Sequence, residues 1–206
     1  DEHSPSQLTR LLFCLPFRLH LFTLAPPMSA SLHLLDSYLP RTETFIWQVL
    51  RKLRRYPPLL LADRRIDPAA FPLPDSAGFL ELAPARSLLT RMAARAAGAY
   101  APVEYPGGHA LLRARDVSVC HAHKGYRALV TRRFVREAGL PLVVNFYGGD
   151  VSQQAFLRRA ARGYGDLFAQ ARFLLVEGPA MRERLLRLGA PEARIREQRL
   201  AIDLSD

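Results

Sequence analysis

The sequence has little cysteine and no long apolar run. Only Cys14 and Cys120 occur among its 206 residues, and they form neither a Cys-x-x-Cys pair nor part of a cysteine-rich framework. This scarcity predicts a protein of the reducing cytosol without a disulfide scaffold. No apolar stretch approaches the roughly 20 residues that span a bilayer. The balance of 49% hydrophobic and 23% charged residues is typical of a globular domain.

Several motifs that mark common chemistries are also absent. The sequence contains no GxGxxG dinucleotide fingerprint, no GxxxxGK[ST] phosphate loop and no GxSxG nucleophile elbow. It therefore gives no support to a nicotinamide site, an ATP site or a serine hydrolase triad. We expect neither a cofactor nor a bound metal.

Lysine is scarce as well, so the positive charge comes almost entirely from arginine. Lysine and arginine number 29 against 19 acidic residues, which gives a formal net charge of +10. This charge favours phosphates, acidic membrane surfaces or nucleic acid without choosing among them, and GC-rich coding would produce the same bias. Because no RNP-like, helix-turn-helix or zinc-finger pattern accompanies the charge, nucleic acid is not an expected partner. The arginines at 51–55 beside Phe45, Trp47 and Tyr56 form either a solvated helix face or a surface for anionic lipid headgroups.

The first residues differ in character from the rest. The chain begins with Asp, and residues 11–27 resemble the apolar region of a signal peptide, but Arg18 and His20 interrupt them. Met28 is therefore the expected natural start. We expect residues 1–30 to be an N-terminal extension, disordered or not native, and residues 31–206 to form one domain.

From Ser31 onward, short apolar strands alternate with amphipathic helices, which is typical of a parallel α/β sheet. Residues 64–84 carry many prolines and predict an irregular connection. Thr42 is the expected N-cap of the first helix, and Gly139 the expected C-cap of the third. The expected strands are 32–36, 59–63, 117–123, 142–147, 173–176 and a short run at 195–200. The expected helices are 43–55, 86–97, 126–138 and 179–188.

In such sheets ligands bind beyond the carboxyl ends of the strands, and two histidines end the strand at 117–123. His121 and His123 are two residues apart and therefore point to the same side of the sheet. Three interpretations stay open. The pair could hold a metal, although no third ligand stands at a recognisable spacing. His123 could hydrogen-bond a phosphate or a sugar hydroxyl, or His121 could pack in the core while His123 is solvated.

The second group follows the strand at 142–147. Gly148 and Gly149 would let the backbone approach a ligand closely and expose N–H groups to it. The alternative is a tight turn that needs positive φ, with Asp150 capping the next helix.

Three long segments together resemble a known family. In order and spacing they are similar to the N-terminal domain of family 4 glycosyltransferases of the GT-B fold, especially those that build exopolysaccharide or colanic-acid-type repeat units. The segments are LLDSYLPRTETFIWQVLRKL, DVSVCHAHKGYRALVTRRFVREAGLPLVVNFYGGDVS and LFAQARFLLVEGPAMRERLLRLGAPEARIREQRLAIDL. The resemblance covers most of residues 32–204 and implies an α/β fold, a Rossmann-like parallel sheet with helices on both faces.

The resemblance also implies an activity. Members transfer a sugar, typically a hexose, from a nucleotide diphosphate sugar with retention of configuration, usually without a metal. The N-terminal domain holds the acceptor, expected here to be lipid-linked or a polysaccharide, and a C-terminal domain holds the donor. The scarcity of cysteine predicts a cytoplasmic setting, and the basic helices beside aromatic residues predict peripheral docking on an anionic inner membrane face.

The resemblance places the site at the strand ends. The candidate catalytic residues are His123, Tyr147 and Asp150. The turn 37–43 would face acceptor and diphosphate, and the 147–150 turn would approach the transferred sugar. The candidate substrate-binding residues are Ser37, Thr42, Glu43, His121, Gly148, Gly149, Glu177 and Gly178.

Three departures from the family pattern matter. Tyr147 stands where many relatives carry His, and Ala201 stands where Gly is usual before the hinge residues 202–203. The chain also stops before the domain that would grip the donor. We therefore expect negligible transferase activity from this chain alone. The alternative is a non-catalytic binding module, or a truncated product that needs a partner chain.

Overall fold

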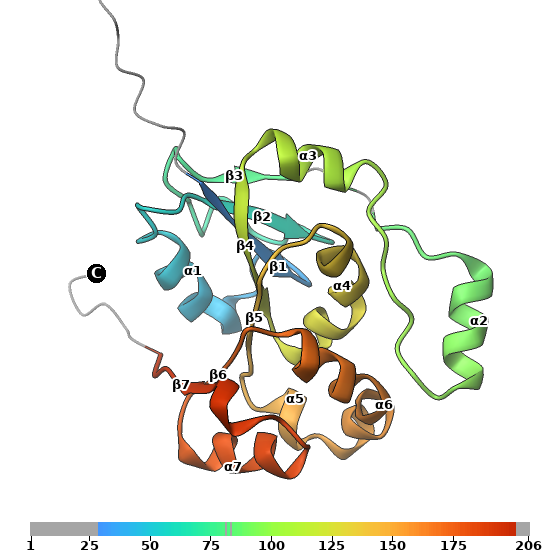
Figure 1. Ribbon diagram of the computed structural model, residues 1–206. Coiled ribbons are helices and arrows are strands. Elements are labelled where there is room, and N and C mark those ends of the chain that lie inside the picture. Colours follow the sequence, from blue (N-terminus) through green and yellow to red (C-terminus); the bar gives the residue numbers. More distant parts are fainter. Residues whose placement is uncertain (1–28, 81, 83, 201–206) are drawn as a thin grey trace, which may run out of the picture.

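A parallel sheet forms the centre of the protein (Figure 1). The structure, a computed structural model, describes residues 29–80, 82 and 84–200. All strand pairs are parallel, and the strand order is β3-β2-β1-β4-β5-β6-β7. The strands are β1 (Ala30–Leu35), β2 (Pro58–Ala62), β3 (Gly78–Phe79), β4 (Val117–His123), β5 (Leu142–Asn145), β6 (Phe173–Val176) and β7 (Ile195–Glu197). Because the order reverses between β1 and β4, this is a doubly wound Rossmann-like arrangement with its switch point at that pair, as expected.

Helices connect the strands. Figure 1 shows α1 and α4 on opposite sides of the central strands, and α2 standing outside the helices that cover the sheet. The α-helices are α1 (Thr44–Leu50), α2 (Leu88–Ala96), α3 (Gly108–Ala114), α4 (Gly125–Glu137), α5 (Gly149–Ser152), α6 (Gln154–Gln170) and α7 (Pro179–Arg187). Two short 3-10 helices are η2 (Arg41–Glu43) and η3 (Glu192–Arg194).

The alternation of side chains along the strands divides the core into two clusters. In β1, Leu34 belongs to the large cluster shared with α4, α6 and α7, whereas Leu35 belongs to a smaller cluster with α1. Leu60 and Leu61 of β2 divide in the same way. Apolar side chains therefore pack against both faces of the sheet, which confirms the expected fold class.

The first predicted helix is shorter than expected. It ends at Leu50, the last buried position of α1, and the chain is extended again by Pro58, which opens β2. Thr42 is not the N-cap, because it lies inside η2 and Glu43 occupies the cap position of α1. Because this 3-10 turn follows Pro40, α1 begins at Thr44 and not directly after Thr42, as the sequence predicted.

The elements β3, α3, α5 and α6 were not among the predicted strands and helices. Only the alternative in which Asp150 caps the next helix implied a helix after the 148–149 turn. The glycines in the sequence of α6 disfavour a helix there. In the structure Gly163 lets α6 approach α4 closely, since a Cβ at this position would lie 2.9 Å from Leu129 Cδ2. By contrast β4, β6 and the C-terminal glycine of α4 are as predicted, with Gly139 at φ +70°.

Some predictions concern parts of the chain outside the described residues. They are residues 1–28 of the expected extension, which include Cys14 and the expected start at Met28, and the hinge at 201–203. Ser29 and Ala30 are described, and β1 begins at Ala30, one residue before the predicted domain boundary.

Candidate functional site

Four neighbouring strands end at the same edge of the sheet. The register pairs Leu34 with Ala122, His123 with Asn145, and Asn145 with Leu175. The turns after β1, β4, β5 and β6 therefore meet there, and we call this edge the strand-end site. It brings together most of the residues that the sequence analysis selected.

Asp150 holds two of these turns together. Its Oδ2 accepts a hydrogen bond from the Gly125 backbone N–H at 2.7 Å, and its Oδ1 accepts from the N–H groups of Tyr147 and Gly148 at 3.2 and 3.1 Å. Asp150 thus lies in the first turn of α5 and caps α4 across the site, rather than capping the next helix as predicted. Burial raises the pKa of this carboxyl, and the backbone donors act in the opposite direction.

The paired glycines make the tight turn that one interpretation required. Gly148 has φ +108°, a conformation that side chains rarely adopt, and a Cβ there would meet nothing within 4 Å. Gly149 opens α5, and a Cβ on it would lie 3.1 Å from Gln153 Nε2. The turn thus leaves open space beside Gly148, where a ligand could approach the backbone.

His123 is buried and His121 is only partly buried, so the alternative in which His121 packs in the core and His123 is solvated is wrong. A third histidine, His33 of β1, lies opposite His121 in the register and was not selected from the sequence. The His121 and His123 rings stack at 4.5 Å between centroids, and His33 stacks on His123 at 5.4 Å. The pKa values of all three are lowered, chiefly by burial, which favours neutral rings.

The three histidines have the composition of a metal site. One nitrogen of each lies within 4.8 Å of the others. However, His123 bonds Tyr147 Oη through Nδ1 at 2.8 Å and His33 Nδ1 through Nε2 at 3.1 Å. His121 Nε2 bonds Asn145 Oδ1 at 2.6 Å. A metal would have to replace the contact between His33 and His123, so the contacts support a hydrogen-bonded cluster.

Lys124 carries positive charge at the strand-end site. This residue follows β4 with φ +83°, an uncommon conformation for a residue other than glycine. Its ammonium group pairs with Glu43, and it lies 4.0 Å from Asp36 Oδ2. Burial raises the pKa of Asp36, while Arg127 and Lys124 oppose the rise.

Arg127 lies beneath this edge and is fully buried. Its guanidinium is 2.9 Å from Asp63 Oδ1 and donates to Tyr105 Oη at 2.5 Å. Asp36 and Asp63 follow β1 and β2, so Arg127 connects α4 to the other half of the sheet. Because one arginine within a helical charge run looks like any other, the sequence offered no signal for this role.

The remaining predicted residues differ in exposure. Ser37 is buried, Glu177 and Gly178 are half-buried, and Thr42 is exposed. Glu177, together with Asp150 and Glu43, adds to the effect of burial that raises the pKa of Tyr147. Glu177 therefore lies close enough to influence Tyr147, whereas Thr42 faces solvent.

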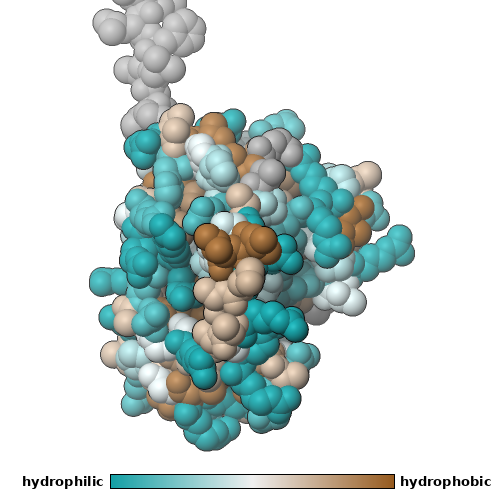
Figure 2. All heavy atoms as spheres, turned by 90° about the vertical axis from the view of Figure 1, so that its right-hand side faces the viewer, coloured by the Kyte–Doolittle hydropathy of each residue, from teal (hydrophilic) through white to brown (hydrophobic). Residues whose placement is uncertain are grey.

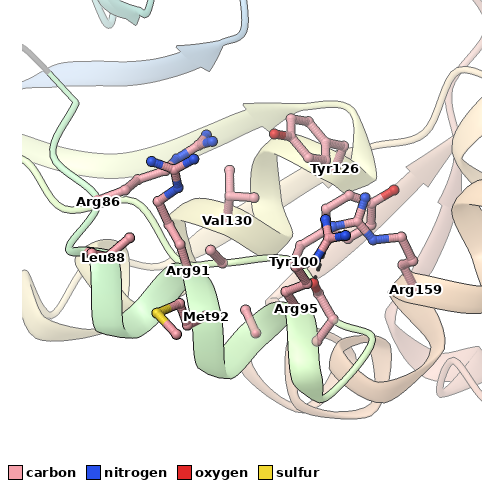
Figure 3. Close-up of a pocket in the computed structure, with 12 residues that line it drawn as sticks. Arg86, Leu88, Arg91, Met92, Arg95, Tyr100, Tyr126, Val130 and Arg159 are labelled. Atoms are coloured by element: carbon pink, nitrogen blue, oxygen red, sulfur yellow. Dashed lines mark hydrogen bonds between the residues drawn. The ribbon is translucent and has the colours of Figure 1, made fainter.

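A separate cavity of about 410 Å³ lies beside α2 (Figure 3). α4 contributes Tyr126 and Val130 to its lining, and Arg159 of α6 stacks over Tyr100 at 4.3 Å. Figure 2 shows an apolar patch at the centre of this side of the molecule. Leu88, Leu89 and Met92 of α2 are exposed by 67%, 79% and 59%. The sequence analysis did not predict this surface.

Comparison with known proteins supplies the family. A family described as "Glycosyl transferase 4-like domain" matches residues 60–197. The chain belongs to this family. Among curated protein sequences, none matches it at a significant level.

The glycosyl transferase 4-like chain is also similar to solved structures of Anabaena Alr3699/HepE. The structure in complex with UDP and glucose has a TM-score of 0.61 at 14% identity, over 86% of this chain and 46% of that one. The complex with UDP-glucose gives 0.60 at 13% identity, over 85% and 45%. The likeness confirms the fold, and the chain spans less than half the length of HepE.

Within residues 29–80, 82 and 84–200, no helix combines the length and the apolarity that crossing a bilayer requires.

Proposed function

We propose that this chain is the acceptor-binding half of a retaining glycosyltransferase of the hexosyl-transferring type. The full enzyme would move a sugar from a nucleotide diphosphate sugar to a lipid-linked or polysaccharide acceptor. The observation that carries the proposal is the strand-end site, in which the turns after four strands meet in a glycosyl transferase 4-like chain. Ligands of doubly wound sheets bind at this position.

The chemistry of the site suits a polyhydroxyl ligand. Its side chains are mostly hydrogen-bond acceptors, namely Asp36, Glu43, Glu177 and the phenolic oxygen of Tyr147. Glu43 and Asp36 already neutralise Lys124. Sugar hydroxyls can donate to such acceptors, whereas a diphosphate needs cations and N–H donors. The acceptor sugar and the transferred sugar therefore fit this edge. In place of the expected contact of the turn 37–43 with the diphosphate, the proposal assigns the diphosphate to the opposite side of the cleft.

The three candidate catalytic residues take different roles in this proposal. Tyr147 faces the sugar, while His123 and Asp150 are positioning residues that hold its hydroxyl and its backbone. Carboxylates such as Glu177 would stabilise the positive charge that develops on the transferred sugar, since preorganised charges act where charge develops. The proposal requires neither a metal nor a cofactor.

The donor would be held mainly by a second Rossmann-like domain. The HepE structures that this chain resembles contain UDP or UDP-glucose and are about twice as long. Half of a cleft cannot exclude water or stabilise the leaving diphosphate. The same edge would also serve a non-catalytic binding module that completes its cleft with a partner chain.

We further propose a cytoplasmic protein that docks on an anionic membrane through the α2 surface. We define this surface as Leu88, Leu89 and Met92 with Arg91 and Arg95, all on α2 (Figure 2). Exposed apolar side chains flanked by arginines suit a bilayer with acidic lipids.

The arginine cluster at 51–55 is a weaker candidate for this docking. Trp47 donates to the Pro72 carbonyl at 2.7 Å and Phe45 packs on Tyr147, so two of the three neighbouring aromatics contact the protein.

Mapping of ligand contacts by NMR tests the proposed site. Methyl α-glucoside added to the chain should perturb the amide signals at Tyr147, Gly148 and Lys124, and Tyr147→Phe should weaken its binding several-fold. Tyr56→Phe, at a tyrosine that is 42% exposed elsewhere, is the matched control. UDP should leave these signals unchanged. Binding of UDP at this edge, or glucoside contacts confined to the cavity beside α2, would contradict the proposal.

Turnover tests the catalytic part. The chain alone, given UDP-glucose and methyl α-glucoside, should release no UDP above the uncatalysed rate. Clear turnover would show that the strand-end site is sufficient for catalysis. It would contradict the proposal that a second domain holds the donor.

A further inference from the structure

A row of hydrogen bonds runs from the strand-end site across the face of the sheet. Tyr147 Oη contacts His123 Nδ1 at 2.8 Å, and His123 Nε2 contacts His33 Nδ1 at 3.1 Å. His33 Nε2 contacts Ser31 Oγ at 3.0 Å, and Ser31 Oγ donates to the Tyr56 carbonyl at 3.1 Å. We call these four side chains and the carbonyl the histidine network.

The last member determines the direction of every bond. A carbonyl oxygen only accepts, so the single hydroxyl proton of Ser31 goes to Tyr56. Ser31 Oγ must then accept from His33, which places the proton of His33 on Nε2. Burial lowers the pKa of His33 well below its ordinary value, so a neutral ring with an unprotonated Nδ1 results.

The same reasoning extends to the other end. Because His33 Nδ1 has no proton, His123 Nε2 must donate to it. Burial also lowers the pKa of His123, so its Nδ1 carries no proton and accepts. The hydroxyl of Tyr147 is then the only group that can supply the proton for the contact at 2.8 Å.

We infer that the histidine network keeps the Tyr147 hydroxyl proton in the hydrogen bond to His123 Nδ1, so that Tyr147 can only accept a hydrogen bond from a ligand. A sugar hydroxyl can donate to this oxygen, whereas the fully ionised diphosphate of a nucleotide sugar has no proton to offer at neutral pH. Tyr147 is thus a specificity-determining residue, and Ser31, His33 and His123 are positioning residues. The inference rests on the proposed function only for the identity of the ligand as a sugar.

The surroundings of Tyr147 act in the same direction. Its pKa is raised by burial and by the carboxylates of Asp150, Glu177 and Glu43, so the phenol keeps its proton. The same carboxylates would repel a phosphate. His121 stands outside the network, because its Nε2 contacts Asn145 Oδ1 instead.

Ring nitrogen NMR tests the inference directly. At about one pH unit above the ordinary histidine pKa of about 6.5, ¹⁵N shifts should show His33 and His123 neutral, with the proton on Nε2. A proton on Nδ1 of either ring would overturn the inference. A shift of all three rings on addition of stoichiometric Zn²⁺ would also overturn it, because the lone pairs would then serve a metal.

Two variants distinguish a fixed direction from simple packing. Ser31→Ala removes the group that fixes His33, so a second tautomer should appear at His33 and then at His123. Tyr147→Phe removes the hydroxyl at the other end of the network. It should leave the tautomers of His33 and His123 unchanged, because the Tyr56 carbonyl determines the direction of the hydrogen bonds. Ser118→Ala, at an exposed position of β4, is the control and should change neither ring. Equal effects of Ser31→Ala and Tyr147→Phe would contradict a direction set by the carbonyl.

Ligand titration then tests the specificity. Methyl α-glucoside should shift the Tyr147 ring and His123 Nδ1 signals, while inorganic sulfate, an oxyanion that carries no proton at neutral pH, should not do so at equal concentration. Sulfate binding at Tyr147 would overturn the specificity. If the tautomers are as inferred but the glucoside does not bind, the result contradicts the proposed sugar-binding function and supports the inferred directions of the hydrogen bonds.

Discussion

Asp150 joins two turns through backbone donors on both of its oxygens. Charge-assisted hydrogen bonds of this kind contribute more than neutral ones, and removing the acceptor leaves buried N–H groups without partners. The carboxylate therefore supports both the start of α4 and the turn that carries Tyr147.

Asp150→Ala should lower the free energy of unfolding by about 3 kcal/mol, because three donors lose their acceptor in a buried place. Urea denaturation measures the change. Asp166→Ala, at an exposed position of α6, is the control and should stay within about 0.5 kcal/mol of the parent. A loss at Asp150 no larger than at Asp166 would show that these hydrogen bonds contribute no net stability.

Glycine at position 125 is required by packing rather than by backbone conformation. A Cβ there would lie 2.6 Å from Tyr164 Oη and 2.7 Å from Phe146 Cε1. Gly125→Ala should therefore destabilise the fold by about 1–3 kcal/mol through overpacking. Gly165→Ala in α6, where a Cβ meets nothing within 4 Å, should be neutral or stabilising by up to about 1 kcal/mol. Thermal unfolding of both variants checks this, and a reversed order would contradict the packing argument.

The sequence could identify only part of the candidate site. Tyr147 and Asp150 follow an apolar run and flank two glycines, which is a local signal at the end of a strand. His33 gave no such signal, since it stands alone among leucines and becomes a neighbour of His121 only through the pairing of β1 with β4. Long-range register is not encoded in any short segment, so the network could not be predicted.

At the scale of elements, strands were easier to predict than helices. The apolar runs of β4 and β6 are bounded by polar residues and were predicted to the residue. The helix α6 was missed because its two glycines and its polar stretch hide a packing face that only α4 reveals. The edge strand β3 contains two residues, too few for any periodic pattern.

The helix α2 has no buried residue, although three large apolar side chains lie on it. Leu89→Asp should therefore reduce binding to vesicles that contain acidic lipids at least several-fold without loss of stability, and higher salt should weaken binding of the parent. Vesicle co-sedimentation measures both effects. Ile66→Ser, at another exposed apolar position, is the matched control and should bind as the parent does. Binding that is insensitive to Leu89→Asp would exclude α2 as the docking element.

At the scale of the whole molecule, the cluster of His33, His121 and His123 links stability to pH. Their pKa values are lowered in the folded protein, so the unfolded chain takes up protons first as the pH falls. Stability should therefore be full above about pH 6.5 and decline below it, by up to about 1.4 kcal/mol per pH unit for each histidine. Asp36 and Asp150, whose pKa values are raised, act in the opposite direction at more acidic pH.

Urea denaturation at several pH values between about 5 and 7.5 measures this decline. His33→Gln should reduce the slope of the unfolding free energy against pH by the contribution of one histidine, because one proton fewer is taken up on unfolding. A slope that stays unchanged in this variant would show that His33 is not the source of the pH dependence.

The position of β1 in the sheet also has a consequence for the order of folding. Cys120 of β4 pairs with Leu142 a short distance along the chain, whereas Leu32 of β1 must find the same Cys120 across a much longer loop. Closing a longer loop costs more entropy, and distant pairings form more slowly. The pairing of β1 with β4 should therefore acquire protection from pulsed hydrogen exchange after the pairings of β1 with β2 and of β4 with β5. On this pathway the last event of folding, the docking of β1 beside β4, is also the event that assembles the His33–His123 contact.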